Sequence, residues 1–99
     1  MSELRFEWDL EKAGSNLSKH GVSFETAVRV FSDPFALTEQ DRIEGGEYRW
    51  QTTGLVDGAL VLLVAHTDWE EHGDEVIRII SARRATTRER RRYAENRSV

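Results

Sequence analysis

The sequence predicts a small α+β domain with two N-terminal helices, an antiparallel β-sheet meander and a C-terminal helix. The hydrophobic period is 3.6 residues before Pro34 and changes to two after Phe35, which separates a helical part from a sheet. Asp57-Gly58 then marks a tight hairpin turn between two alternating segments. The 99 residues are expected to form one domain, 1–99, because a chain of this length buries a single core.

The N-terminal part begins with a short strand, in which Phe6 and Trp8 alternate with charged residues. A first helix is expected from the N-cap Asp9 to about Lys19, with Gly21 as its left-handed stop. Its apolar stripe is Leu10, Ala13 and Leu17, and a polar stripe beside it is Lys12, Asn16 and His20. A second helix, capped by Ser23 and ended by Asp33-Pro34, has a core-facing stripe of Phe24, Ala27, Val28 and Phe31.

The second part is expected to be a sheet followed by one helix. Four strands are predicted at about Phe35–Glu39, Tyr48–Leu55, Leu60–Thr67 and Val76–Arg84. Polar segments, Asp41–Gly46 and Asp68–Glu75, are interpreted as a turn region and a charged loop between them. Thr86, with Glu89 three residues later, is a capping box that opens the last helix.

The composition excludes several classes of protein. Cysteine is absent, which excludes a disulfide framework, a thiolate nucleophile and a cysteine–metal cluster. The longest apolar run, Ala59–Ala65, is far shorter than the roughly 20 residues that span a bilayer. The N-terminus has no apolar signal region. The sequence therefore predicts a cytoplasmic protein without membrane contact.

Charge is distributed very unevenly along the chain, whose net charge is −4. Residues 76–99 hold eight of the fourteen basic residues and two of the eighteen acidic ones, a local charge of +6. Residues 1–75 hold the remaining six bases and sixteen acids, a local charge of −10. Every base in the tail is arginine, whose planar fork matches phosphate geometry. This pattern predicts a polyphosphate partner, most plausibly nucleic acid, that binds a strand and helix on an acidic body.

Strand alternation sorts the arginines of the tail into two faces. It predicts Val76, Arg78, Ile80, Ala82 and Arg84 on one face and Ile77, Ile79, Ser81, Arg83 and Ala85 on the other. Arg78 either pairs across strands with Asp68 or Glu47 or binds an anion, and the two alternatives have similar weight. Arg83 and Arg84, at the end of the strand, favour binding of an anion or a partner. Arg88 belongs to a basic helix that is either solvated or a docking face.

The three histidines differ in their expected roles. His20 closes the first helix, where the helix dipole favours a histidine and its ring could act as an acid or a base, although it is also explained as a capping residue. His66 is expected to be a satisfied core or rim group and His72 a solvent-exposed loop residue. Their spacing makes a zinc site improbable, and no metal or organic cofactor is expected.

Three segments together resemble the BrnT toxins. They are Phe6-Glu-Trp-Asp-Leu-Glu-Lys-Ala-Gly-Ser-Asn-Leu-Ser-Lys-His-Gly-Val-Ser-Phe-Glu-Thr-Ala27, Gly46-Glu-Tyr-Arg49 and Arg78-Ile-Ile-Ser-Ala-Arg-Arg-Ala85, the last followed by an Arg-Glu-Arg-Arg helix that reaches a tyrosine. The match covers nearly the whole chain in the expected order. Many relatives have an arginine shortly after the threonine of the penultimate strand, whereas here Thr67 is followed by an acidic segment that could weaken phosphate binding.

The resemblance implies a RelE-like ribonuclease toxin of a type II toxin–antitoxin system, held in a hetero-oligomer by a BrnA-like, DNA-binding antitoxin. It carries over Lys19 and His20, with Arg49, Arg78 and Arg83 as the basic set. Metal-independent RNA cleavage needs an acid and a base, for which His20 and Glu47 are candidates, and cations for the phosphate charge. Arg49, Arg84 and Arg88 are expected to bind RNA. The alternatives are a non-catalytic interaction module and a nucleic-acid binder without cleavage.

Overall fold

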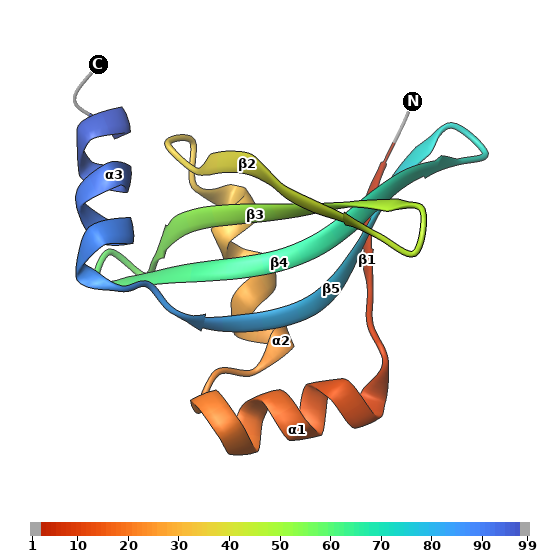
Figure 1. Cartoon of the computed structure of the whole chain (residues 1–99), viewed down its shortest axis with the longest axis horizontal. Helices are drawn as coiled ribbons and strands as arrows, with labels where there is room; N and C mark the ends of the chain where they lie inside the picture. The colour runs from red at the N-terminus through yellow and green to blue at the C-terminus, as the bar shows by residue number, and fades with distance from the viewer. Residues whose placement is uncertain (1–2, 98–99) are drawn as a thin grey trace.

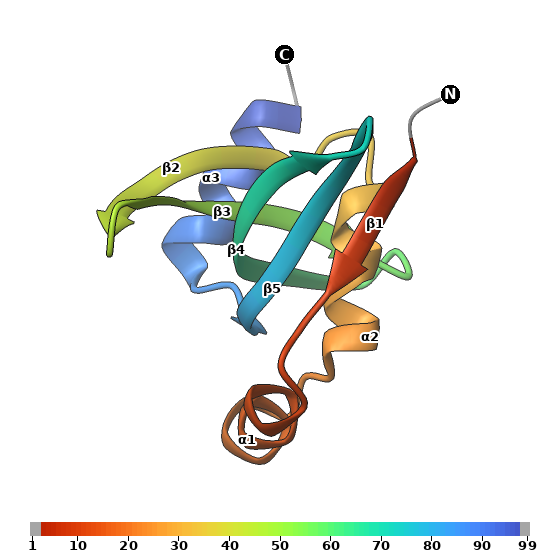
Figure 2. The same ribbon diagram turned by 90° about the vertical axis from the view of Figure 1, so that its right-hand side faces the viewer.

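The protein is described here by a computed structural model of residues 3–97. A five-stranded sheet in the order β1-β5-β4-β3-β2 forms its centre, with α1 and α2 near one face and α3 at one end of the other (Figures 1 and 2). The strands are β1 (Leu4–Glu7), β2 (Leu37–Glu44), β3 (Glu47–Val56), β4 (Leu60–Glu71) and β5 (Asp74–Arg84). The helices are α1 (Leu10–His20), α2 (Phe24–Ala27), the 3₁₀ helix η1 (Val28–Ser32) and α3 (Thr87–Arg97).

The expected antiparallel meander is confirmed for β2 to β5. The first strand extends this sheet in a way that the sequence did not predict, because β1 pairs in parallel with β5 at the sheet edge. This parallel pairing is possible because a long connection, through the helices and the other strands, separates β1 from β5 in the chain. Glu7 of β1 therefore lies directly beside Arg78 of β5.

Helix α1 begins and ends where the sequence predicts, but it packs through a different face. The Asp9 carboxylate accepts hydrogen bonds from the first-turn amides, and Gly21 ends the helix with φ of 70°. The predicted apolar stripe is wrong for Leu10 and Leu17, which are 82% and 51% exposed. Asn16 is buried instead, because its amide bonds the backbone of β5 and of the following loop.

The second helix is shorter than expected, since α2 changes into the 3₁₀ helix η1 after Ala27. Ser23 caps its first turn as predicted, and Phe24, Ala27 and Val30 are buried in the core. The close approach of η1 to the sheet depends on Gly54, because a Cβ atom there would lie 2.9 Å from that of Val30.

The two polar segments within the sheet are mostly strand. The predicted loop 68–75 is wrong: β4 continues to Glu71 and β5 begins at Asp74, with the turn at His72-Gly73. The predicted turn region 41–46 likewise shrinks to Gly45-Gly46. All four turn residues have positive φ, as does the predicted turn Asp57-Gly58, and this conformation matches tight hairpins. Charged residues dominate both hairpin ends, and the few apolar ones, the pairs Ile43–Tyr48 and Trp69–Val76, are too isolated to mark these segments as strands.

A β-bulge in β5 changes which arginines share a face. Ser81 pairs with Ala65 while Ile79 pairs with the next residue of β4, so Ile80 is the extra residue. Ala82 consequently lies in the core with Ile77 and Ile79. The predicted division of β5 into two regular faces is therefore wrong beyond Ile79, and Arg83 moves to the same side of the sheet as Arg78.

Helix α3 begins with the predicted capping box. The Glu89 carboxylate accepts from the Thr86 amide at 2.8 Å, and the Thr86 hydroxyl accepts from the Glu89 amide at 3.2 Å. Tyr93 is the buried residue of this helix, and its hydroxyl donates to Asp33. Burial opposes ionisation of Asp33, but bonds from Tyr93 and from the Leu55 and Phe35 amides lower its pKa. Burial and the Asp33 charge raise the pKa of Tyr93 to about 12.

Candidate active site

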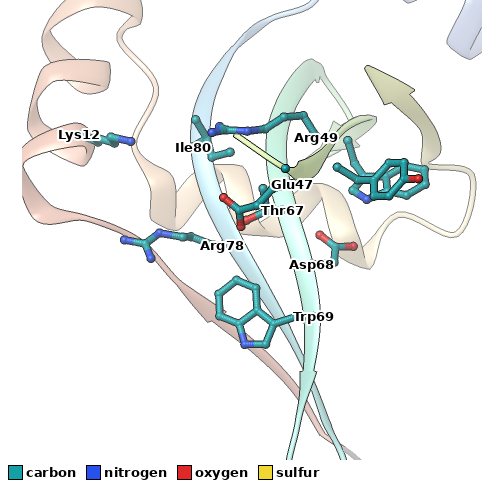
Figure 3. A pocket seen from close by; sticks show the side chains of 11 residues that line it. Lys12, Glu47, Arg49, Thr67, Asp68, Trp69, Arg78 and Ile80 are labelled. Carbon is teal, nitrogen blue, oxygen red and sulfur yellow. The ribbon is translucent and has the colours of Figure 1, made fainter. Parts of the chain in front are cut away.

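A groove of about 850 Å³ opens on the side of the sheet opposite the core, at the end that α3 leaves uncovered. Its volume falls within the ~300–1,000 Å³ typical of small-molecule sites. Residues of α1, β3, β4 and β5 and of the β2–β3 turn line it, and we call it the basic groove (Figure 3): Lys12, Gly46, Glu47, Tyr48, Arg49, Trp50, Thr67, Asp68, Trp69, Arg78 and Ile80.

Three cations from three different elements meet in the basic groove. Lys12 of α1, Arg49 of β3 and Arg78 of β5 direct their side chains toward the same open space (Figure 3). The Nε atom of Arg49 is buried, and no hydrogen-bond partner for it occurs within residues 3–97. An unpaired buried donor on a guanidinium carries a desolvation cost, which a bound anion removes if the side chain turns this atom toward the groove. The groove is therefore suited to bind a phosphate.

Lys12 is a groove residue that the sequence does not mark as functional. Its only signal there is its place in a polar stripe with Asn16 and His20. The buried amide of Asn16 fixes this stripe against β5, with bonds of 2.8 and 3.0 Å to the backbone of Ala82. Lys12 lies one turn before Asn16 on the same helix face, so this anchor also brings Lys12 to the groove.

Arg78 has a different neighbour from the two that were expected. It pairs with neither Asp68 nor Glu47; its Nη1 lies 3.6 Å from Oε1 of Glu7. Both side chains are 48% exposed, so the pair is loose and solvated. The parallel pairing of β1 with β5, unseen in the sequence, creates this contact. Arg78 therefore remains accessible to a ligand from the groove.

Carboxylates and aromatic rings complete the lining. Glu47, at the start of β3, is an exposed carboxylate in the groove. Tyr48 and Trp50 stack with ring centroids 6.4 Å apart. Asp68 extends from the other side of β4 (Figure 3), where it contacts Nδ1 of His66 at 2.5 Å. The acidic segment after Thr67 thus directs its first carboxylate away from the cations.

His66 is a satisfied core residue, as the sequence predicts. Its side chain is 1% exposed and contacts Asp68 through Nδ1 and the Thr52 hydroxyl through Nε2 at 2.7 Å. Thr52 continues the chain of polar contacts to Thr38 at 2.8 Å. His72 is exposed at the tip of the β4–β5 hairpin.

Lys19 and His20 lie at the C-terminal end of α1, where both are exposed. Neither lines the basic groove. Eight residues separate Lys12 from His20, which corresponds to about 12 Å along the helix axis. The structure therefore brings Arg49, Arg78 and Glu47 together from the predicted set, and places this histidine and lysine apart from them.

Arg83 is engaged by α3. Its Nη1 and Nη2 atoms donate to the two carboxylate oxygens of Glu89 at 2.8 and 3.0 Å. The bond from Arg83 lowers the pKa of Glu89 to about 2, and the bond to Glu89 raises the pKa of Arg83. Arg84 and Arg88 are exposed outside the groove. Of the predicted basic set, Arg83 thus has a strong intramolecular partner at the base of α3.

Within residues 3–97, no cluster of three histidine, aspartate or glutamate side chains is suited to a metal ion. No helix in this range combines the length and apolar character needed to cross a bilayer.

Comparison with known proteins identifies the family. Residues 8–89 match the sequence model of the family described as "Ribonuclease toxin, BrnT, of type II toxin-antitoxin system". Among solved structures, the fold is similar to the crystal structure of the Brucella abortus ribonuclease toxin BrnT, with a TM-score of 0.63 and 20% identity. That match covers 87% of this chain and 100% of the Brucella chain. No curated protein matches the sequence. The chain belongs to the BrnT family of ribonuclease toxins of type II toxin–antitoxin systems.

Proposed function

We propose that the basic groove cleaves RNA without a metal ion, by attack of a 2′-hydroxyl on the adjacent phosphate. The observation that carries this proposal is the convergence of Lys12, Arg49 and Arg78, with a buried and unpaired Nε on Arg49. The scissile phosphate gains negative charge in the transition state, and fixed cations stabilise that charge. Arg49 and Arg78 bind the phosphate oxygens, while Lys12 holds a neighbouring phosphate.

The reaction needs two proton transfers. As the 2′-oxygen bonds to phosphorus, its proton passes to a base, and the bond to the 5′-oxygen breaks as that oxygen gains a proton. Of the two carboxylates that line the groove, Asp68 points away from the cations, whereas Glu47 lies on their side. We therefore assign the role of the base to Glu47. The products are a 2′,3′-cyclic phosphate and a 5′-hydroxyl. His20, the base that the sequence favours, stays a prediction, which the comparison of the Lys12 and His20 variants tests.

Purified protein, incubated with RNA in the presence of EDTA, should produce 2′,3′-cyclic phosphate ends. Arg49→Ala, Arg78→Ala and Glu47→Gln should each lower the rate by ~10²–10³-fold, which is the effect of removing one transition-state donor. Arg29→Ala is the matched control, because this arginine pairs with the exposed Asp57 outside the groove. Loss of cleavage in EDTA, with recovery on adding a divalent cation, would contradict the metal-independent mechanism.

The two ends of α1 offer a direct comparison. Lys12→Ala should slow cleavage by about tenfold or more, whereas His20→Ala should leave most of the rate, because only Lys12 lines the groove. Initial rates at equal protein concentration measure both effects, and circular dichroism confirms that each variant folds. If His20→Ala instead abolishes cleavage by a folded protein, the base is His20 and the groove assignment of Glu47 is wrong.

We further propose that a BrnA-like, DNA-binding antitoxin silences the toxin in a cytoplasmic hetero-oligomer, and that the fold is related to RelE-like toxins. The expected contact region is Arg83–Arg92, in which Arg84 at the end of β5 and Arg88 in α3 are exposed. An acidic or apolar antitoxin segment would complement this surface. Co-expression with the protein of the neighbouring gene, followed by purification at moderate salt, tests the partnership. Separation of the two proteins under these conditions would contradict it.

A further inference from the structure

Trp69 lies on the groove side of β4 in a position that the catalytic proposal does not use. Strand pairing places Thr67 opposite Arg78 and Trp69 opposite Val76, so Trp69 is the diagonal neighbour of Arg78. Diagonal neighbours in an antiparallel pair are ~7–8 Å apart, within reach of large side chains. Figure 3 shows the ring on the same side of β4 as Arg78.

The indole ring is partly exposed and fixed at its polar edge. Its Nε1 donates a hydrogen bond to Oε2 of Glu71 at 3.2 Å. Glu71 is itself 3.5 Å from the guanidinium of Arg5 in β1. A ring whose only polar atom is already bonded can offer its apolar face to a ligand without leaving that donor unpaired.

The balance of charge differs between the two sides of Trp69. In the basic groove the cations Lys12, Arg49 and Arg78 outnumber the carboxylates Glu47 and Asp68, whereas the β4–β5 hairpin carries Glu70, Glu71 and Glu75 beside the one cation Arg5 of β1. A phosphate is attracted to the first side and repelled by the second. We therefore expect a nucleotide bound in the groove to place its phosphate at the cations. Its base then points toward the β4–β5 hairpin and lies near Trp69.

We propose that Trp69 is a stacking platform for an RNA base next to the phosphate bound by Arg78. This inference rests on the proposed RNA cleavage and makes its substrate specific: the base must be unpaired, so the substrate is single-stranded RNA. Bases within a duplex are stacked on their neighbours and cannot lie on a protein ring, whereas splayed bases of single strands can. The groove volume, about 850 Å³, suits such an extruded nucleotide.

Binding of an uncleavable oligonucleotide tests the inference separately from catalysis. The probe is a fluorescein-labelled, single-stranded 2′-O-methyl RNA octamer, compared with the same octamer in which every base is removed. Fluorescence anisotropy measures the dissociation constants at low salt. Alanine substitution of an aromatic residue that stacks on a base typically weakens binding ~5- to 150-fold. Trp69→Ala should therefore raise the dissociation constant of the octamer by a factor in this range. Trp69→Phe, which keeps a ring, should lose only a few-fold.

The abasic octamer separates stacking from phosphate binding. Trp69→Ala should bind it as well as the wild type does, because no base remains to stack. Arg78→Ala should weaken both octamers, since both carry the phosphates. Trp69→Leu keeps apolar contact with Val76 without a planar ring, and it provides the same comparison if the alanine variant unfolds.

Several results would overturn the inference. They are wild-type affinity of a folded Trp69→Leu variant for the intact octamer, an equal loss of affinity for both octamers, and no binding of the intact octamer by the wild type. An unchanged affinity of Arg78→Ala for both octamers, with the Trp69 effect intact, would count against the proposed phosphate site and leave the stacking platform supported.

Discussion

The pair formed by Arg83 and Glu89 predicts that Arg83 acts on stability. We expect Arg83→Ala and Glu89→Gln each to lower the melting temperature at neutral pH. Glu89→Gln is the cleaner change, because glutamine keeps the capping bond to the Thr86 amide while the charge is removed. The sequence alone favours binding of an anion or a partner by Arg83, a role whose loss would not lower the melting temperature.

The magnitude follows from the pKa of Glu89. Its reduction from 4.5 to about 2 corresponds to about 3 kcal/mol at ~1.36 kcal/mol per pKa unit. The Arg83 side chain is 37% exposed, and solvent screening reduces this figure to about 1–2 kcal/mol. A domain of this size melts ~4–8 °C lower for each kcal/mol lost. The expected decrease is therefore about 5–15 °C.

The dependence on pH has a definite sign. The folded pKa of Glu89 is depressed, so its stabilisation is fully present above the unfolded value near 4.5 and is lost as pH falls from 4.5 toward 2. Wild type and Glu89→Gln should therefore differ most at neutral pH and converge at pH 2. Thermal melts by circular dichroism across this range measure the convergence.

A double-mutant cycle and a control complete the test. The double variant Arg83→Ala, Glu89→Gln should be little less stable than either single variant, because the two residues act as one pair. Arg29→Ala breaks an exposed pair with Asp57 and should cost less than about 1 kcal/mol. The reasoning is refuted if Arg83→Ala melts like the wild type, and loss of RNA cleavage by that stable variant would return Arg83 to a catalytic role.

Three further outcomes follow from contacts around the groove. Glu7→Gln removes the carboxylate beside Arg78 and should tighten binding of the uncleavable octamer a few-fold at low salt, an effect that disappears in ~1 M salt. Gly54→Ala forces a Cβ against Val30 and should cost ~1–3 kcal/mol in chemical denaturation, whereas Gly14→Ala, in open space on α1, should add ~0.5–1 kcal/mol. With three groove cations, log K for single-stranded RNA should fall with log salt at a slope of about −2, and a slope near −5 would implicate the basic tail as well.

The parts of the fold that depend on neighbouring residues were predictable from the sequence. The predicted ends of the first two helices are confirmed at Asp9, Gly21 and Ser23. The expected capping box forms between Thr86 and Glu89. These signals involve bonds between residues two to four positions apart, so the sequence contains all their partners. The hairpin at Asp57-Gly58 follows for the same reason, whereas the turns Gly45-Gly46 and His72-Gly73 lay inside segments that the sequence marked only as polar.

The parts that failed depend on contacts between distant segments. Asn16 is buried because it bonds the β5 backbone 66 residues away, and this contact leaves Leu10 and Leu17 exposed where periodicity placed them inside. The bulge at Ile80 similarly arises from the register between β4 and β5 and moves Arg83 across the sheet. No pattern in one segment encodes either event. The same contact of Asn16 brings Lys12 to the groove. Because the sequence gives no sign of this contact, it does not indicate Lys12 as a binding residue.

The charge split along the chain therefore indicates a partner more reliably than it locates the site. The C-terminal tail is strongly basic, yet two of its arginines form ion pairs within the protein, Arg83 with Glu89 and Arg92 with Glu39 of β2. Part of the positive charge of the tail is therefore neutralised by the protein's own carboxylates. Two of the three groove cations, Lys12 and Arg49, belong to the acidic part of the sequence. A cation contributes to phosphate binding when the fold directs it into a shared open space, as it does for Lys12 and Arg49. The exposed residues Arg84 and Arg88 stay predictions, as contacts of RNA or of the proposed antitoxin, which the salt slope and the co-purification test.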